Sequence, residues 1–180
     1  IPAGGGCKEI LRRVVSPPMY IADVDSIPFV RNAFGMIMNS TVSSSAYDAR
    51  KLKFISDTDR IVVNYNNLLN EAKFSVMYMS QSNYCPPSRT KIYVGGENIY
   101  SILMSDIYQM NESNYISNYD LVIGKKLAWI LCGGEIIESQ WVDEKYILEL
   151  ERQSFIDLIG LDKTIDRIEH TLATGKMLRN

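Results

Sequence analysis

The sequence has few of the residues that build metal sites and disulfide frameworks. Its 180 residues include three cysteines and one histidine. Cys7, Cys85 and Cys132 are far apart, and no Cys-x-x-Cys pair occurs. Structural zinc sites need clustered Cys and His ligands, so we predict no metal site. An odd cysteine count also favours a reducing compartment, and we expect the protein to be cytoplasmic.

Strong charge of one sign and long apolar runs are missing as well. The formal net charge is -2 and the sequence pI is about 5.5, which argues against nucleic-acid binding. The most apolar run, residues 121–132, contains Lys125 and Lys126 and is too short to span a bilayer. We therefore expect no nucleic-acid partner and no membrane span. Hydrophobic residues make up 46% of the chain, which is enough for a globular core.

Apolar residues recur three or four positions apart along most of the chain, which is the spacing of one helix face. Capping residues, prolines and glycines then predict helices over 7–15, 27–38, 46–52, 67–80, 96–110, 118–132, 143–160 and 164–175. The first of these should end before Pro17 and Pro18. The β-branched run from Arg60 to Asn64 is the best strand candidate. The predicted fold class is mainly α, with at most one or two short strands.

Two further expectations concern the middle of the chain. In the helix over 67–80, the periodicity places one set of side chains inward, namely Leu68, Leu69, Ala72, Val76 and Met79. Pro86 and Pro87 interrupt the pattern that follows this helix. We therefore predict two domains, residues 1–85 and residues 86–180.

Three glycines, Gly4 to Gly6, lead directly into the first predicted helix. A P-loop needs Lys and then Ser or Thr directly after its last glycine, but Cys7 follows here. A dinucleotide fingerprint needs Gly or Ala three residues after Gly6, where this chain has Glu9. The segment is then either a helix N-terminus whose N–H groups face a pocket, or a glycine turn that packs a helix closely.

The same segment carries a family resemblance. Ile1–Gly6 is similar to the Ile-Pro-Gly-Ala-Gly-Gly segment of the crotonase (enoyl-CoA hydratase) family, and residues 42–55 resemble the next family motif, with its usual glycine replaced. Residues 119–134, 150–155 and 164–180 are similar to one branch. In that branch, a bacterial 3-hydroxyacyl-CoA dehydrogenase is fused to a C-terminal enoyl-CoA hydratase domain.

The resemblance implies a fatty-acid β-oxidation enzyme that acts on acyl-CoA thioesters as both oxidoreductase and lyase. Residues 1–85 would be the helical C-terminal part of a crotonase-like domain, and residues 86–180 a helical extension used in oligomerisation. The two catalytic Glu, the oxyanion hole and the NAD-binding domain would precede Ile1. We therefore expect this chain to bind no cofactor and to be inactive alone, with NAD bound by the preceding domain.

The resemblance also implies site residues within this chain. The backbone N–H of Ala3 would hold the attacking water, and Gly4 and Gly5 would lie beside the substrate. Basic residues near the C-terminus, Lys176 and Arg179, are candidates for the phosphates of CoA, although a solvated helix face is the simpler explanation of them.

The family resemblance also leads to an expectation about the association state. An incomplete domain leaves apolar faces to be covered by self-association, so we expect a homo-oligomer. The alternative function is a helical oligomerisation or protein-interaction module without chemistry of its own.

Overall fold

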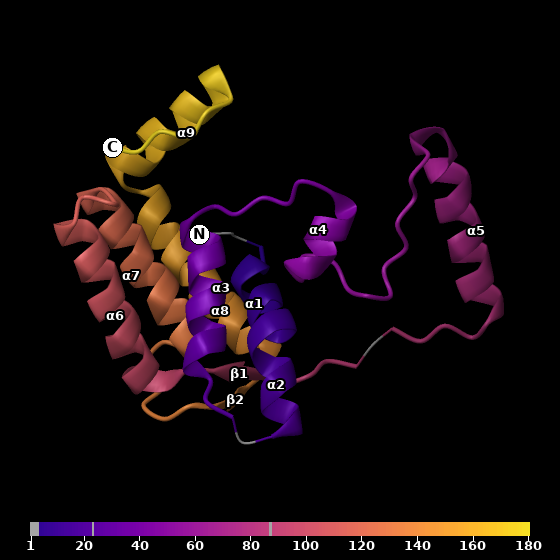
Figure 1. Cartoon of the computed structure of the whole chain (residues 1–180), viewed down its shortest axis with the longest axis horizontal. Helices are drawn as coiled ribbons and strands as arrows, with labels where there is room; N and C mark the ends of the chain where they lie inside the picture. The colour runs from indigo at the N-terminus through magenta and orange to yellow at the C-terminus, as the bar shows by residue number, and fades with distance from the viewer. Residues whose placement is uncertain (1–3, 23, 87) are drawn as a thin grey trace. The chain divides into compact units, whose positions relative to one another are not determined.

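A computed structural model describes residues 4–22, 24–86 and 88–180 of the chain. Within these residues the protein is mainly helical with one small two-stranded sheet, so the predicted fold class is confirmed (Figure 1). In chain order the elements are α1 (Gly6–Ile10), the π-helical η1 (Leu11–Val15), α2 (Ser16–Ile21), α3 (Ile27–Met38), α4 (Ala46–Lys51), the 3-10 helix η2 (Tyr65–Asn67), α5 (Leu68–Gln81), β1 (Ile92–Val94), α6 (Gly96–Glu112), α7 (Asn118–Cys132), β2 (Gln140–Val142), α8 (Glu144–Ile159) and α9 (Asp162–Thr174).

The chain forms two compact units. The first unit comprises Ile1–Thr41 and Thr90–Asn180, and the second comprises Val42–Arg89. The first unit therefore contains α1 to α3, α6 to α9 and both strands, while the second contains α4, η2 and α5. The division into a crotonase-like part and an extension at residues 85 and 86 stays a prediction.

The first helical segment continues through the two prolines, so the predicted end before Pro17 is wrong. The backbone N–H of Ser16 donates to the carbonyl of Leu11, a π-type bond that widens the helix at η1. Pro17 and Pro18 then lie in the first turn of α2, where the missing N–H costs little. The wider turn relieves the clash that a proline ring makes with the preceding helical turn.

Helix α7 lies at the centre of the first unit, where it packs against α3, α6 and α8. Its ends follow the sequence signals. Ser117 and Asp120 form a capping box at its start, and Gly133 ends it with a φ of 88°. The fully buried apolar side chains of this core come from segments far apart in the chain and include Leu11, Val15, Val30, Leu103, Ile107, Leu127, Ile130, Leu131 and Ile147.

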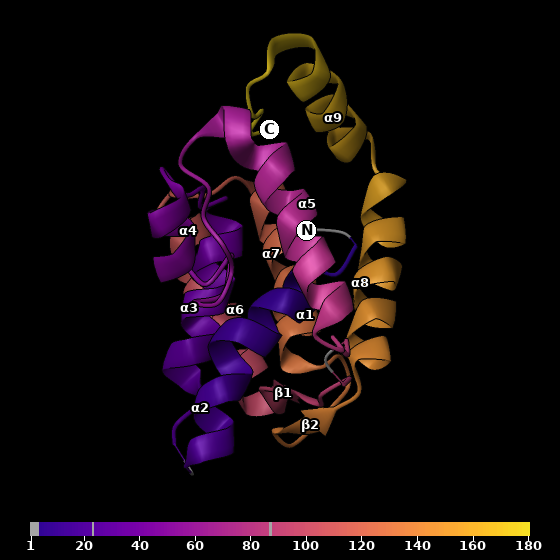
Figure 2. The same cartoon turned by 90° about the vertical axis from the view of Figure 1, so that its right-hand side faces the viewer.

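The sheet lies at one end of this helical unit, and α9 lies at the opposite end (Figures 1 and 2). Strands β1 and β2 are antiparallel, with Tyr93 opposite Trp141. The strand predicted over Arg60 to Asn64 is wrong, because that segment forms no regular structure. Arg60 instead pairs with Glu71 of α5. A β-branched run becomes a strand only where a partner strand can pair with it.

The second unit buries little. Ser45 caps α4, since its hydroxyl accepts the N–H of Asp48 at 3.1 Å. None of the residues of α5 is buried, so the predicted inward face is wrong. Leu69 is 81% exposed and Val76 is 61% exposed. The periodicity of α5 indicates which side chains share a face, but no residue that the structure describes in this unit buries that face.

Candidate functional site

The glycine turn at the start of α1 has a backbone conformation that favours glycine. Gly4 and Gly5 have φ angles of 79° and 104°, which lie in the left-handed region that side chains disfavour. Gly5 is the N-cap residue of α1, and no side-chain cap from that position is available. Ala3, the predicted water-holding residue, lies outside the described residues, and its role stays a prediction.

A distant carboxylate supplies the missing cap. Glu151 of α8 accepts the N–H of Gly5 on Oε2 at 2.7 Å and the N–H of Lys8 on Oε1 at 2.5 Å. Glu151 is only 2% exposed. Burial raises the pKa of Glu151, although both N–H groups and the charge of Lys8 oppose this effect.

Sequence reasoning missed Glu151, because it lies 146 residues beyond Gly5. One signal could have found it. Glu151 occupies the apolar face of α8, four residues after Ile147 and three before Ser154, and all three are buried. A carboxylate on a buried helix face needs donors, and unpaired N–H groups at a helix start are suitable ones.

A shallow hollow adjoins the turn. We call it the glycine hollow, and its lining is Gly4, Gly5, Leu148, Glu151, Arg152 and Phe155. Most of this lining is apolar, while the N–H groups of Gly5 and Lys8 are bonded to Glu151. The hollow can therefore accept an apolar or thioester group more readily than an anion. The predicted substrate contacts at Gly4 and Gly5 remain predictions.

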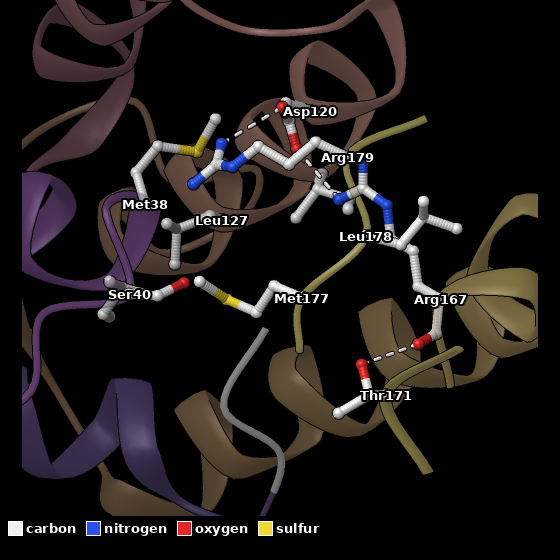
Figure 3. Close-up of a pocket in the computed structure, with 11 residues that line it drawn as sticks. Met38, Ser40, Asp120, Leu127, Arg167, Thr171, Met177, Leu178 and Arg179 are labelled. Carbon is white, nitrogen blue, oxygen red and sulfur yellow. Dashed lines mark hydrogen bonds and ion pairs between the residues drawn. The ribbon is translucent and has the colours of Figure 1, made fainter. Parts of the chain in front are cut away.

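Two arginines near the C-terminus, Arg167 and Arg179, bind the carboxylate of Asp120 on α7 (Figure 3). Arg167 of α9 donates from Nη1 to Asp120 Oδ1 at 2.8 Å, and Arg179 donates from Nη1 to Asp120 Oδ2 at 3.2 Å. Asp120 is 4% exposed. Burial alone would raise the pKa of Asp120, but the N–H of Ser117 and the two guanidinium groups together hold it below its ordinary value.

These residues line a cavity that we call the tail pocket. Its lining comes from α3, α7, α9 and the C-terminal residues, namely Ile37, Met38, Ser40, Asp120, Ile123, Leu127, Arg167, Thr171, Met177, Leu178 and Arg179. Two guanidinium groups on one carboxylate leave the cluster with one excess positive charge. The side chain of Arg179 is 46% exposed, so this charge is accessible from solvent.

The structure brings only some of the predicted site residues together. Arg179 lines the tail pocket, while Gly4 and Gly5 line the glycine hollow, and the two share no lining residue. Lys176 is exposed, and its backbone N–H donates to Thr174 Oγ1 at 3.2 Å. The pairing of Arg179 with Asp120 could not be predicted from the sequence, because the two lie 59 positions apart.

Two kinds of bound group can be compared with the described residues: a metal ion held by clustered ligands and a pyrophosphate held at the glycine turn. No group of three or more His, Cys, Asp or Glu in the described part of the chain is arranged to hold a metal ion. A pyrophosphate at the glycine turn would meet the carboxylate of Glu151, which already takes the N–H groups that phosphate needs. Of the helices described, none has the length and apolar character needed to cross a membrane.

Comparison with known proteins finds a relative of the whole chain. A protein of Bacillus subtilis (strain 168) named "Probable 3-hydroxyacyl-CoA dehydrogenase" is 38% identical over 184 aligned residues, which cover 100% of this chain and 22% of that relative. The predicted likeness to a 3-hydroxyacyl-CoA dehydrogenase is therefore confirmed as a similarity of the whole chain to part of a longer protein. No family model matches the chain. No solved structure matches it either.

Proposed function

We propose that this chain is part of a fatty-acid β-oxidation enzyme that joins NAD-dependent 3-hydroxyacyl-CoA dehydrogenase and enoyl-CoA hydratase activities. The proposed dehydrogenase activity is supported by the 38% identity along the whole chain to a probable 3-hydroxyacyl-CoA dehydrogenase. The hydratase rests on the similarity of Ile1–Gly6 to the crotonase-family segment. The full-length protein would be a cytoplasmic oxidoreductase and lyase, with NAD bound by residues that precede this chain.

The chain itself would be inactive. Hydration of an enoyl thioester develops negative charge on the carbonyl oxygen, and removal of one oxyanion donor costs about 10²–10³ in rate. Loss of the general acid and base costs roughly a further 10²–10⁴. The glycine hollow contains one carboxylate, Glu151, and two backbone N–H groups already occupy it. The acid, the base and the oxyanion donors would therefore come from other residues of the full-length protein.

Arg179 and Lys176 would help to bind the phosphates of CoA. Guanidinium groups bind phosphate oxygens in a bidentate manner. The excess positive charge of the Asp120, Arg167 and Arg179 cluster and the exposure of Arg179 support this assignment. The double variant Lys176→Ala with Arg179→Ala should raise KM for acyl-CoA, while Arg31→Ala, which removes an exposed cation from α3, should not.

The test of the proposal uses the full-length protein that contains this chain. Incubated with a 3-hydroxyacyl-CoA and NAD, it should oxidise the hydroxyl to a ketone, transfer the hydride to NAD and release the hydroxyl proton to solvent. The absorbance of NADH follows this reaction. With crotonyl-CoA it should add water across the double bond. The 180-residue chain should do neither above a blank. Absence of both activities from the full-length protein would contradict the proposal, and hydration by the chain alone would contradict its inactivity.

Helix α5 favours a second candidate, a helical oligomerisation module without chemistry. None of its residues is buried, and its exposed apolar side chains need a partner. A homo-oligomer is compatible with both candidates. Sedimentation of the 20.5 kDa chain should give a mass above that of a monomer. A monodisperse monomer would contradict the module, whereas an oligomer with an inactive full-length protein would favour it over the enzyme.

A further inference from the structure

Glu151 is a buried carboxylate whose placement is costly. Carboxylates leave water at a high free-energy cost unless charges or donors compensate them. The neighbouring cations have other partners, since Lys8 pairs with Glu9 and Arg152 pairs with Glu149. Glu151 instead accepts hydrogen bonds from the backbone N–H groups of Gly5 and Lys8.

Two other helices of this protein, α4 and α7, begin with caps from neighbouring residues in the sequence. The hydroxyl of Ser45 caps α4, and Ser117 caps α7 within a capping box. Both caps come from residues within three positions of the helix start, although the box of α7 also uses the buried carboxylate of Asp120. At α1, the cap comes instead from 146 residues away. Residues that break the usual local rules of stability, as a buried carboxylate does at a helix start, are concentrated at functional sites.

The two bonds of Glu151 fix both ends of a short segment. One carboxylate oxygen holds Gly5 at the turn, and the other holds Lys8 one helical turn later. The glycines at the turn have left-handed φ angles and little intrinsic preference for a single conformation. A clamp at Gly5 and Lys8 removes that freedom and fixes how the turn faces the glycine hollow, which Glu151 also lines.

We propose that Glu151 is a positioning residue of the hydratase site, holding the Gly4–Gly5 turn in the orientation that the enoyl thioester requires. This role rests on the proposed function. In this role Glu151 acts through the backbone, because each of its oxygens accepts an N–H of the segment from Gly5 to Lys8. Preorganisation of this kind matters because small displacements of a positioned group can lower the rate about 100-fold.

The test compares Glu151→Ala and Glu151→Gln in the full-length protein. Glu149→Gln is the matched control, since Glu149 lies on the same helix, is exposed and pairs with Arg152. In Glu151→Ala, hydrogen exchange at Gly5 and Lys8 should become roughly tenfold faster or more. The kcat for crotonyl-CoA hydration should fall about 10- to 100-fold with KM little changed. Glu151→Gln keeps one acceptor oxygen and should recover part of both.

The NAD-dependent oxidation of a 3-hydroxyacyl-CoA by the same preparations separates the outcomes. Loss of both activities in equal measure would make Glu151 a residue of the fold and overturn the positioning role. Loss of hydration in both variants with unchanged exchange would make it a catalytic group, which also overturns the role. If wild type hydrates and Glu151→Ala hydrates equally well, the positioning role alone is wrong. If wild type does not hydrate crotonyl-CoA, the proposed hydratase function is wrong, and the role is overturned with it.

Discussion

Arg167 on α9 donates from Nη1 to Oδ1 of Asp120 over 2.8 Å, and this pair joins the last helix to the start of α7. The two side chains are 18% and 6% exposed, so water screens the pair only in part. Arg167 also donates from Nε to Oδ1 of Asn180 at 2.8 Å. The last residues of the chain and α9 are therefore held to α7 by polar contacts, whereas no residue of α9 is buried.

Asp120→Ala should destabilise the first unit more than most single substitutions. It removes the capping box of α7 and leaves two guanidinium groups without their shared carboxylate. Removal of one partner from a buried pair costs about 3–5 kcal/mol. Urea denaturation should show this loss in the free energy of unfolding. Asp106→Ala, which breaks an exposed pair with Arg31, should cost about 1 kcal/mol or less. Similar losses in the two variants would contradict the buried character of the Asp120 cluster.

Because of the same carboxylate, Asp120, we expect the protein to lose stability in acid. The pKa of Asp120 is lower in the folded protein than its ordinary value of 3.8, so the unfolded chain binds a proton more readily. The contribution of Asp120 is therefore fully present above about pH 4 and is lost as pH falls through the lower folded pKa. The pKa of Glu9, which burial would raise but Arg12 and Lys8 lower to about 2, acts in the same direction.

Asp120→Asn tests this dependence, because the amide keeps an acceptor oxygen but does not titrate. The free energy of unfolding, measured from pH 6 to pH 2 (the range set by the direction of the shift), should fall less steeply in Asp120→Asn than in wild type. Parallel curves for the two proteins would show that Asp120 has the same pKa in the folded and unfolded states.

Local signals in the sequence indicate both ends of α7, although the helix end predicted before Pro17 is wrong. The capping box at Ser117 and the glycine at position 133 need only neighbouring residues to act, and both are present in the structure. The pairing of β1 with β2 depends on residues far apart in the chain, so no local pattern reveals it. The inward face predicted for α5 failed for a related reason, because periodicity indicates sidedness but not what lies on that side.

The candidate site also contains some features that local sequence signals indicate and others that depend on distant residues. The glycine turn is visible in the sequence, since only particular residues adopt its backbone angles. Its partner Glu151 is not, because α8 reaches the turn only after the fold is complete. Arg179 is recognisable in the sequence as a cation near the C-terminus. The sequence around its partner Asp120 indicates only a capping residue of α7. Contacts between distant segments determine the chemistry of both places.

Gly96→Ala should destabilise the connection between the sheet and α6. Gly96 has a φ of 70°, and a Cβ there would lie 2.7 Å from the backbone carbonyl oxygen of Ile137. The conformation alone costs about 1–2 kcal/mol for a residue with a side chain, and the contact with rigid backbone adds to it. Thermal unfolding should show a lower Tm. Gly35→Ala is the matched control, since nothing lies within 4 Å of its Cβ position in α3, and it should stabilise by about 0.5–1 kcal/mol.

The three cysteines should differ sharply in their reactivity. Cys85 is exposed, whereas Cys7 and Cys132 are buried. Burial raises the pKa of Cys132 to about 12, and burial together with the charge of Glu151 also raises the pKa of Cys7. Because the thiolate is the reactive form, an aromatic disulfide reagent should modify Cys85 rapidly in the native protein. The other two thiols should react only at the rate at which the first unit unfolds.

Peptide mass spectrometry after a short exposure to the reagent locates the modified residue. Cys85→Ser should lose the rapid phase and keep the slow one, and both remaining thiols should become reactive together in denaturant. Modification of Cys7 at the rate of Cys85 would mean that the start of α1 opens independently of the core. In that case the bonds from Glu151 to Gly5 and Lys8 would not hold the glycine turn closed.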